Sequence, residues 1–141
     1  MDVSTRVAAA TTFVWLGMVL AISFVEAPLK FRAPGVTLRI GLGIGRLIFR
    51  ALNTLELLFA VVICAVLFTH HTPDRLNIAI TVAVGMLLLQ LVVVRPLLSR
   101  RTTEVLEGDE TERSRAHFAY VALELVKVVS LVVAGIAILG M

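Results

Sequence analysis

Four long apolar runs limit the folds that this sequence can adopt. The chain has 141 residues, of which 59% are hydrophobic, and its mean hydropathy is +0.98. An apolar run of about 20 residues is long enough to cross a hydrocarbon core ~30 Å thick. Four such runs fit, over residues 7–28, 46–68, 76–98 and 115–140. We therefore expect an all-α membrane protein in which one domain, residues 1–141, forms a four-transmembrane-helix bundle. The short connections leave no room for a soluble catalytic domain, so an enzyme is the less favoured interpretation.

The basic residues gather in two of the three connections between the runs. Ten lie between or just inside the first and second runs or the third and fourth: Lys30, Arg32, Arg39, Arg46, Arg50, Arg95, Arg100, Arg101, Arg113 and Arg115. Only Arg6 and Arg75 belong to the opposite side. The positive-inside rule then predicts that both basic loops are cytoplasmic and both termini are outside. The expected location is the inner or plasma membrane of the cell.

Polar side chains within the apolar runs form the candidate intramembrane site. They are Glu26, Arg46, Arg50, Asn53, Glu56, Gln90, His117, Tyr120, Glu124 and Lys127. On a helix turning about 100° per residue, the four in the last run fall within roughly 80° of arc. The four between residues 46 and 56 spread over roughly 120°. Each of these two runs therefore carries a polar stripe.

The depths of the two stripes predict which charges meet. Glu56 lies ten residues beyond Arg46, and Lys127 lies ten beyond His117. At 1.5 Å per residue both are ~15 Å along helices that run in the same direction. If these helices pack face to face, Glu56 should meet Lys127 near the bilayer midplane.

The same alignment makes further predictions. Glu124 should meet Asn53 and Arg50. Glu26 and Gln90 should approach from the other two helices, at the level of Arg46 and His117.

Two interpretations of these charges remain open. Each charge inside a span costs ~2.5–3.5 kcal/mol even on permissive insertion scales, so a cluster of them needs an explanation. They could line a polar cavity for an ion, a proton or a polar head group. Alternatively, they could form neutralised pairs that fix helix packing and register.

The first connection contains prolines and glycines whose roles can be anticipated. Pro28 and Pro34 should bracket a short, restrained segment, because proline fixes its own φ and disfavours helix in the residue before it. The glycines at 41, 43 and 45 lack the spacing and the Lys-Ser/Thr ending of a phosphate loop. We expect them to form a flexible or tightly packed entry to the second run.

The sequence offers little to hold a metal ion or a cofactor. Cys64 is the only cysteine, so a thiolate cluster within one chain is excluded and a small core residue is expected. His70 and His71 are adjacent and followed by Thr-Pro-Asp, which favours a solvated turn. Haem ligation usually needs an inward histidine, and only His117 belongs to a span. We expect no catalytic residues, no metal and no cofactor.

Three short motifs resemble those of a known family. They are Glu-Ala-Pro-Leu-Lys-Phe-x-Ala-Pro at 26–34, Gly-Arg-x-x-Phe-x-x-x-Asn-x-x-Glu at 45–56 and His-x-x-Tyr-x-x-x-Glu-x-x-Lys at 117–127. Together they resemble small bacterial four-span proteins of unknown function, distantly similar to the transmembrane protein 205-like domain. The resemblance implies a four-helix membrane bundle and brings no reaction, cofactor or substrate.

Three functions are compatible with these observations. The first is transport or binding of an ion, a proton or a small molecule at the intramembrane polar site, in a homo-oligomer formed through small residues. The second is a redox or enzyme subunit that holds a quinone or lipid near His117, Tyr120 and Arg46. The third is an accessory or assembly subunit of a membrane complex. The expected surroundings are a lipid bilayer, without a nucleic-acid partner.

Overall fold

The fold is a bundle of long helices. The computed structural model describes residues 2–94 and 115–141, with side chains in 2–92 and 120–141. The helical elements are α1 (Val3–Val19), the π-helical segment η1 (Leu20–Glu26), α2 (Ala27–Leu29), the 3₁₀ turn η2 (Lys30–Arg32), α3 (Leu38–Thr69), α4 (Asp74–Leu89), the π-helical segment η3 (Gln90–Val94) and α6 (Arg115–Leu139). Within the described residues no strand occurs. Four stretches are long and apolar enough to cross a membrane: Val3–Arg32, Leu38–Thr69, Asp74–Val92 and Tyr120–Leu139. The predicted all-helical bundle with four helices long and apolar enough to cross a membrane is confirmed.

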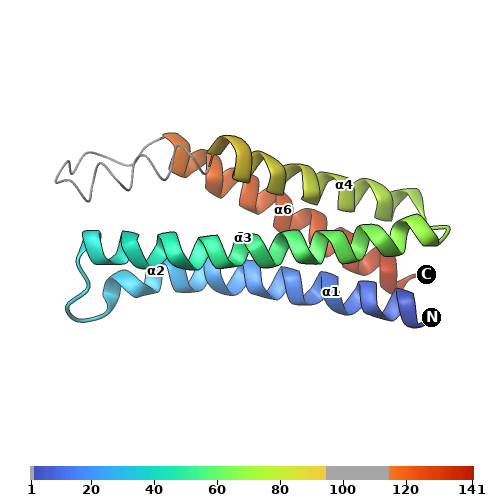
Figure 1. The fold of residues 1–141 in the computed structure, drawn as a ribbon, viewed down its shortest axis with the longest axis horizontal. Coiled ribbons are helices and arrows are strands. Elements are labelled where there is room, and N and C mark those ends of the chain that lie inside the picture. Colours follow the sequence, from blue (N-terminus) through green and yellow to red (C-terminus); the bar gives the residue numbers. More distant parts are fainter. Residues whose placement is uncertain (1, 95–114) are drawn as a thin grey trace.

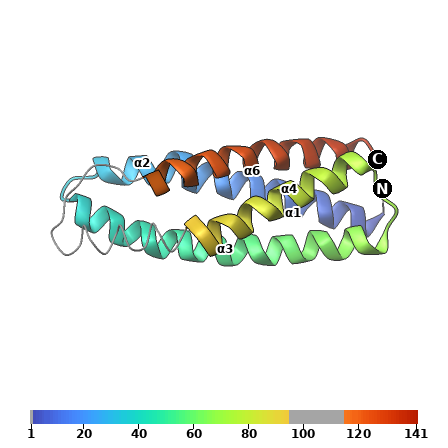
Figure 2. The same cartoon turned by 90° about the horizontal axis from the view of Figure 1, so that it is seen from above.

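The helices form a closed ring in which neighbours in sequence are neighbours in space. Close backbone contacts join α1 to α3, α3 to α4, α4 to α6, and α6 back to α1. The two views of the ribbon show these helices running side by side along one long axis, with both chain termini at the same end (Figures 1 and 2). In this ring α3 and α6 are diagonal partners, which face each other across the centre of the bundle.

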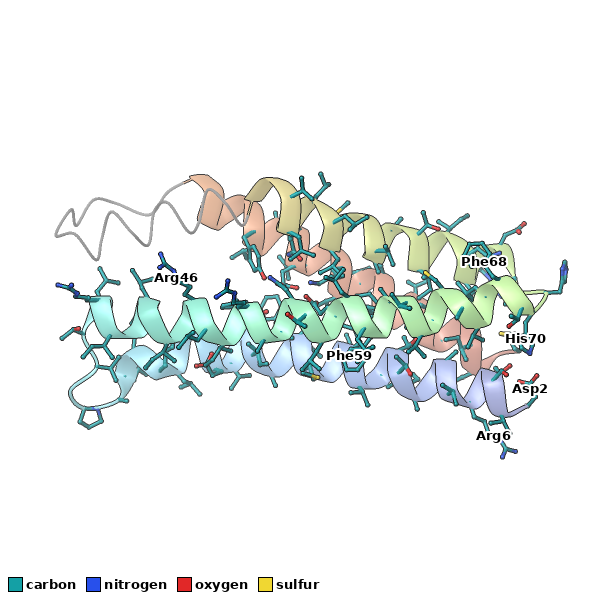
Figure 3. The ribbon with its side chains drawn as sticks, in the orientation of Figure 1. Asp2, Arg6, Arg46, Phe59, Phe68 and His70 are labelled. Carbon is teal, nitrogen blue, oxygen red and sulfur yellow. The ribbon has the colours of Figure 1, made fainter. Side chains whose placement is uncertain are left out.

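Apolar residues fill the centre of the bundle and also cover its outside. Trp15, Ile63, Leu87 and Leu131 are fully buried and belong to the main hydrophobic core. Many other large apolar side chains point outward, and Phe68, near one end of α3, is 91% exposed (Figure 3). An outward apolar surface on helices of this length is what a lipid bilayer covers.

The first connection is shorter than expected, because the first helical stretch does not stop at Pro28. It continues through α2 and η2 to Arg32. Proline disrupts a helix interior because it lacks an N–H and crowds an earlier carbonyl, but it is tolerated in the first helical turn. Here Pro28 lies at the start of α2, directly after the π-helical segment η1. The chain then turns at Gly35, whose φ of 82° suits glycine, and Thr37 caps α3 by accepting a hydrogen bond from the N–H of Ile40 at 3.2 Å.

The glycines at the beginning of α3 are tightly packed. The ring of Phe31 lies so close to Gly41 that a Cβ there would be 2.1 Å from a ring carbon. Nζ of Lys30 would lie 2.8 Å from a Cβ at Gly45. Both glycines are therefore contact points for the end of the first helical stretch. Of the two expectations for this segment, tight packing is the one observed.

Candidate functional site

A fully buried lysine with two buried carboxylates lies at the centre of the bundle. Nζ of Lys127 is 2.5 Å from Oε1 of Glu56 and 2.6 Å from Oε1 of Glu124. It also donates a hydrogen bond of 2.8 Å to Oε1 of Gln90. The ammonium therefore lies within ion-pair distance of two carboxylates and donates to one amide oxygen. We call Glu56, Glu124, Lys127 and Gln90 the central cluster.

The first helical stretch adds two hydrogen-bond donors to the central cluster. The indole Nε1–H of Trp15 donates to Oε1 of Glu56 at 2.9 Å. The hydroxyl of Ser23 donates to Oε2 of Glu124 at 3.3 Å. Side chains from α1–η1, α3, η3 and α6 therefore converge on one point, and each of the four spans supplies at least one of them.

The diagonal placement of α3 and α6 explains which residue types can meet at the centre. Neighbouring helices pack ~8–10 Å apart, so the axes of diagonal helices in such a ring are ~11–14 Å apart. Glu56 and Lys127 have long side chains that together span this distance. The rings of Phe49 and Tyr120 do the same nearby, with centroids 5.6 Å apart and an edge-to-face angle of 83°.

Both π-helical segments supply a partner to the central cluster. Ser23 lies within η1, and Gln90 is the first residue of η3. Single π-helical turns interrupt α-helices rarely, and they occur frequently at functional sites. In this bundle the two π-helical segments supply the polar side chains that contact Glu124 and Lys127.

The predicted contact between Glu56 and Lys127 is present, and the prediction for Gln90 is only partly right. Gln90 points inward, but it lies deeper than the level of His117 that we expected. It contacts the ammonium of Lys127, and its Nε2 donates a hydrogen bond of 3.4 Å to the carbonyl of Tyr120. The prediction assumed that all four helices enter the membrane at equal depths. Gln90 instead lies at the depth of Lys127, ten residues beyond His117 on α6.

The predicted partners of Glu124 are wrong. Arg50 is exposed on the outside of α3. Asn53 is only 2% exposed, yet neither of its amide atoms has a hydrogen-bond partner. Its side chain is shorter than that of glutamate, so it does not reach across the diagonal to α6. Glu124 is bound instead by Lys127 on its own helix and by Ser23.

Asn53 is not the only buried group with unused hydrogen-bonding capacity. Oε2 of Glu56, three residues further along α3, is also buried and has no hydrogen-bond partner. Residues three apart on a helix are neighbours on one face. One face of α3 therefore carries an amide and a carboxylate oxygen that are both buried and without a hydrogen-bond partner.

The remaining predicted residues lie outside the central cluster. Glu26 is one-third exposed and pairs at 3.7 Å with Lys30, four residues later on the same helical stretch. Arg46 is half-buried and lies on the side of α3 that faces away from α1 (Figure 3). Tyr120 is buried against Phe49. His117 belongs to α6, but its side chain lies outside the described residues.

Sequence reasoning missed Trp15 and Ser23, although one of them carried a usable signal. Trp15 is the only tryptophan of the chain and lies in the middle of an apolar run, whereas tryptophan in membrane proteins is enriched at the interfaces. A buried indole N–H usually finds a hydrogen-bond acceptor. A tryptophan at this depth therefore predicts a polar acceptor on a neighbouring helix. Ser23 carried no comparable signal, because serine is common at helix contacts in membranes.

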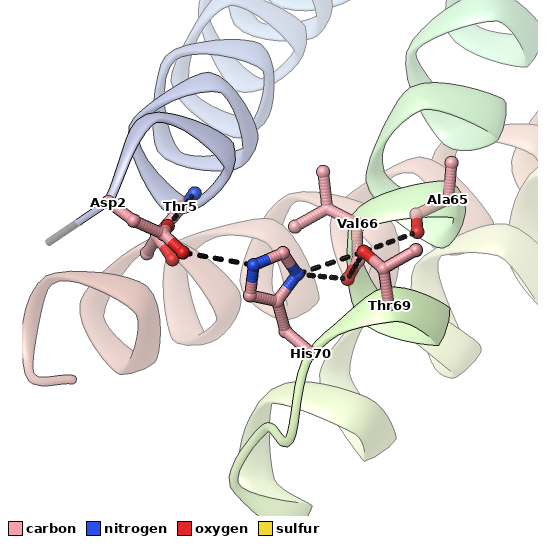
Figure 4. A network of polar contacts seen from close by, with 6 residues as sticks. All are labelled: Asp2, Thr5, Ala65, Val66, Thr69 and His70. Atoms are coloured by element: carbon pink, nitrogen blue, oxygen red, sulfur yellow. Dashed lines mark hydrogen bonds and ion pairs between the residues drawn. The ribbon is translucent and has the colours of Figure 1, made fainter.

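A second polar network lies at the end of the bundle that holds the termini (Figure 4). Asp2 caps α1 by accepting a hydrogen bond of 2.8 Å from the N–H of Thr5, and its other carboxylate oxygen is 2.9 Å from Nε2 of His70. These contacts hold the pKa of Asp2 at about 2, with the hydrogen bonds from Thr5 as the main cause and His70 as a smaller one. Nδ1 of His70 lies 3.2 Å from the carbonyl of Val66. The turn expected to be merely solvated therefore anchors the first helix.

In the described part of the chain, no three histidine, cysteine, aspartate or glutamate side chains are grouped so that they could hold a metal ion. Cys64 is half-buried and packs against the hydrophobic core. The chain matches no protein-family model, no curated protein and no solved structure. Its function must be inferred from the geometry of the central cluster.

Proposed function

We propose that this membrane protein binds and carries a proton, or another single positive charge, at the central cluster. The observation that supports this proposal is that two fully buried carboxylates share one buried ammonium. With Glu56, Glu124 and Lys127 all ionised, the cluster has one more negative than positive charge. A net charge is costly in a membrane interior, so the cluster gains from taking up one positive charge.

The cluster can hold that charge in a low-dielectric environment without losing its other contacts. A proton on one carboxylate leaves the other carboxylate paired with Lys127. Intramembrane carboxylates that take up and release protons are typical of pumps and transporters. We therefore favour transport over the accessory role, in which the same charges would only hold the helices together.

We also propose the orientation that follows from the basic residues. The end of the bundle that carries Lys30, Arg39 and Arg50 would face the cytoplasm, and the end with both termini would lie outside. The resemblance to small bacterial four-span proteins is compatible with this arrangement and remains a proposal.

Proton flux into vesicles tests the proposal directly. The purified protein is reconstituted into vesicles that contain a pH-sensitive dye, and a membrane potential is imposed. We expect flux through the native protein and its loss in Glu124→Gln, which removes the excess negative charge while Glu56 and Lys127 stay paired. The matched control is Glu26→Gln, the same substitution at a glutamate outside the central cluster, which should keep native flux.

The single tryptophan provides a second readout that does not depend on transport. Because Trp15 donates to Glu56, protonation of Glu56 changes the environment of the indole. We expect the intrinsic fluorescence to change with pH in the native protein and in Glu26→Gln, but not in Glu56→Gln. Equal pH responses in all three proteins, together with flux that survives Glu124→Gln, would contradict proton binding at this cluster.

A further inference from the structure

Asn53 is the buried polar residue whose environment is least complete. Its side chain is 2% exposed, and both the oxygen and the nitrogen of its amide lack a hydrogen-bond partner. Buried amides are normally hydrogen-bonded, because burial without a partner costs free energy. Lys127 is directed to other groups, since its ammonium pairs with Glu56 and Glu124 and donates to Gln90.

Asn53 faces the interior between two contacts that cross the bundle. Phe49, four residues earlier on α3, meets Tyr120 of α6, and Glu56, three residues later, meets Lys127 of α6. Residues at these spacings share one face of a helix. Asn53 therefore lies on the face of α3 that is directed toward α6, at a depth between Tyr120 and Lys127.

The chemistry of the unpartnered atoms selects the kind of ligand that fits there. Asn53 offers an acceptor and two donors, and Oε2 of Glu56 offers a second acceptor. A bare metal ion would bind the oxygens and leave the amide N–H groups without an acceptor. A water molecule can donate to both oxygens and accept from the amide, and buried waters typically occupy sites with two to four polar partners.

We propose that Asn53 and Oε2 of Glu56 hold a water molecule through which protons reach the central cluster. A proton arriving on this water as hydronium passes to Oε2 of Glu56. One O–H bond of hydronium breaks, one O–H bond of the carboxylic acid forms, and a neutral water molecule remains. Asn53 positions the water and does not itself exchange the proton. This inference deepens the proposed function, because it gives Glu56 a proton source.

The test separates the rate of proton uptake from its extent. The full-length protein in detergent is subjected to a rapid pH jump, and Trp15 fluorescence reports protonation of Glu56. Asn53→Leu keeps the branched shape of the side chain but cannot hydrogen-bond to water. We expect proton uptake to slow by about tenfold, equivalent to ~1.4 kcal/mol in the barrier, with an unchanged final amplitude. Thr54→Val, at an exposed neighbour on α3, should keep the native rate.

A second variant keeps the inference testable if Asn53→Leu folds poorly. Asn53→Ser retains a hydroxyl that can bind water, so its uptake rate should lie closer to that of the native protein. A native uptake rate in Asn53→Leu, together with a raised melting temperature, would show that the native amide is buried without a bound water. That result would overturn this inference but not the proposed function. A pH response that persists in Glu56→Gln would instead overturn the proposed function.

Discussion

Replacing Lys127 with methionine tests the charge balance of the central cluster most directly. The substitution keeps the length of the side chain but removes the ammonium that lies 2.5 Å and 2.6 Å from two carboxylates. Removing one partner from a buried ion pair costs about 3–5 kcal/mol, because an uncompensated buried charge remains. Here two carboxylates lose their counter-charge, so we expect a loss of at least this size in the free energy of unfolding.

The opposite substitution in the same cluster should be mild. Glu124→Gln removes one negative charge and leaves Glu56 and Lys127 as a neutral pair. Its cost should be about 1 kcal/mol, the typical net contribution of a single hydrogen bond. The combination of Lys127→Met with Glu56→Gln and Glu124→Gln contains no charge at all, so it should recover much of the stability that Lys127→Met loses.

Reversible unfolding in detergent micelles at neutral pH, followed by circular dichroism, measures these differences. The double variant Lys127→Met with Glu56→Gln is a useful intermediate, because Glu124 stays charged and without its cation. Its stability should fall between that of Lys127→Met and that of the triple variant. If Lys127→Met proved as mild as Glu124→Gln, the cluster could not be an ionised group held by its single cation, and the charge argument would be wrong.

Three further substitutions test the packing, the tryptophan contact and the helix cap. Gly41→Ala should destabilise by about 1–3 kcal/mol because the added methyl meets a phenyl ring, whereas Gly43→Ala, where nothing lies within 4 Å, should be neutral or stabilising; thermal melts compare them. Trp15→Phe should lower the free energy of unfolding by about 1.5–3 kcal/mol, because the cluster loses a hydrogen bond to a charged group, and no effect in a chemical-denaturation curve would argue against that bond. The pKa of Asp2 falls from 3.8 to about 2 on folding, so its stabilisation is complete above pH 3.8 and is lost as the pH falls to about 2. The difference in melting temperature between the native protein and Asp2→Ala should therefore shrink over that interval, and a constant difference would contradict the assignment.

The number of spans and the pairing of their central charges could be predicted from the sequence, for different reasons. Hydropathy depends only on composition, so four apolar runs give four helices whatever their arrangement. The contact between Glu56 and Lys127 followed from depth, because both lie near the middle of helices that run in the same direction. Depth was sufficient here because both side chains are long enough to meet even though α3 and α6 are diagonal to each other.

The partners of Glu124 could not be predicted, because depth says nothing about lateral position. Asn53 and Arg50 lie at suitable depths, but α3 is diagonal to α6, and a short amide does not cross that distance. Ser23 supplies the contact instead, from a neighbouring helix and from a π-helical segment. A π turn changes which side chains face inward, and no residue pattern in the sequence indicated one. Pro28 misled for a related reason, since the same irregular segment allows the helix to continue through it.

The central cluster also has a consequence for how the chain is made. Glu56 and Lys127 are about 70 residues apart, so the ribosome completes the helix with the acid well before the helix with the base. At 5–20 residues per second the interval is about 4–14 s. During that time Glu56 has no cation to pair with. Trp15 and Ser23, which also contribute to the central cluster, have already been synthesised. In the proposed four-span topology, the last span to be synthesised therefore brings the cation that pairs with a carboxylate on an earlier one.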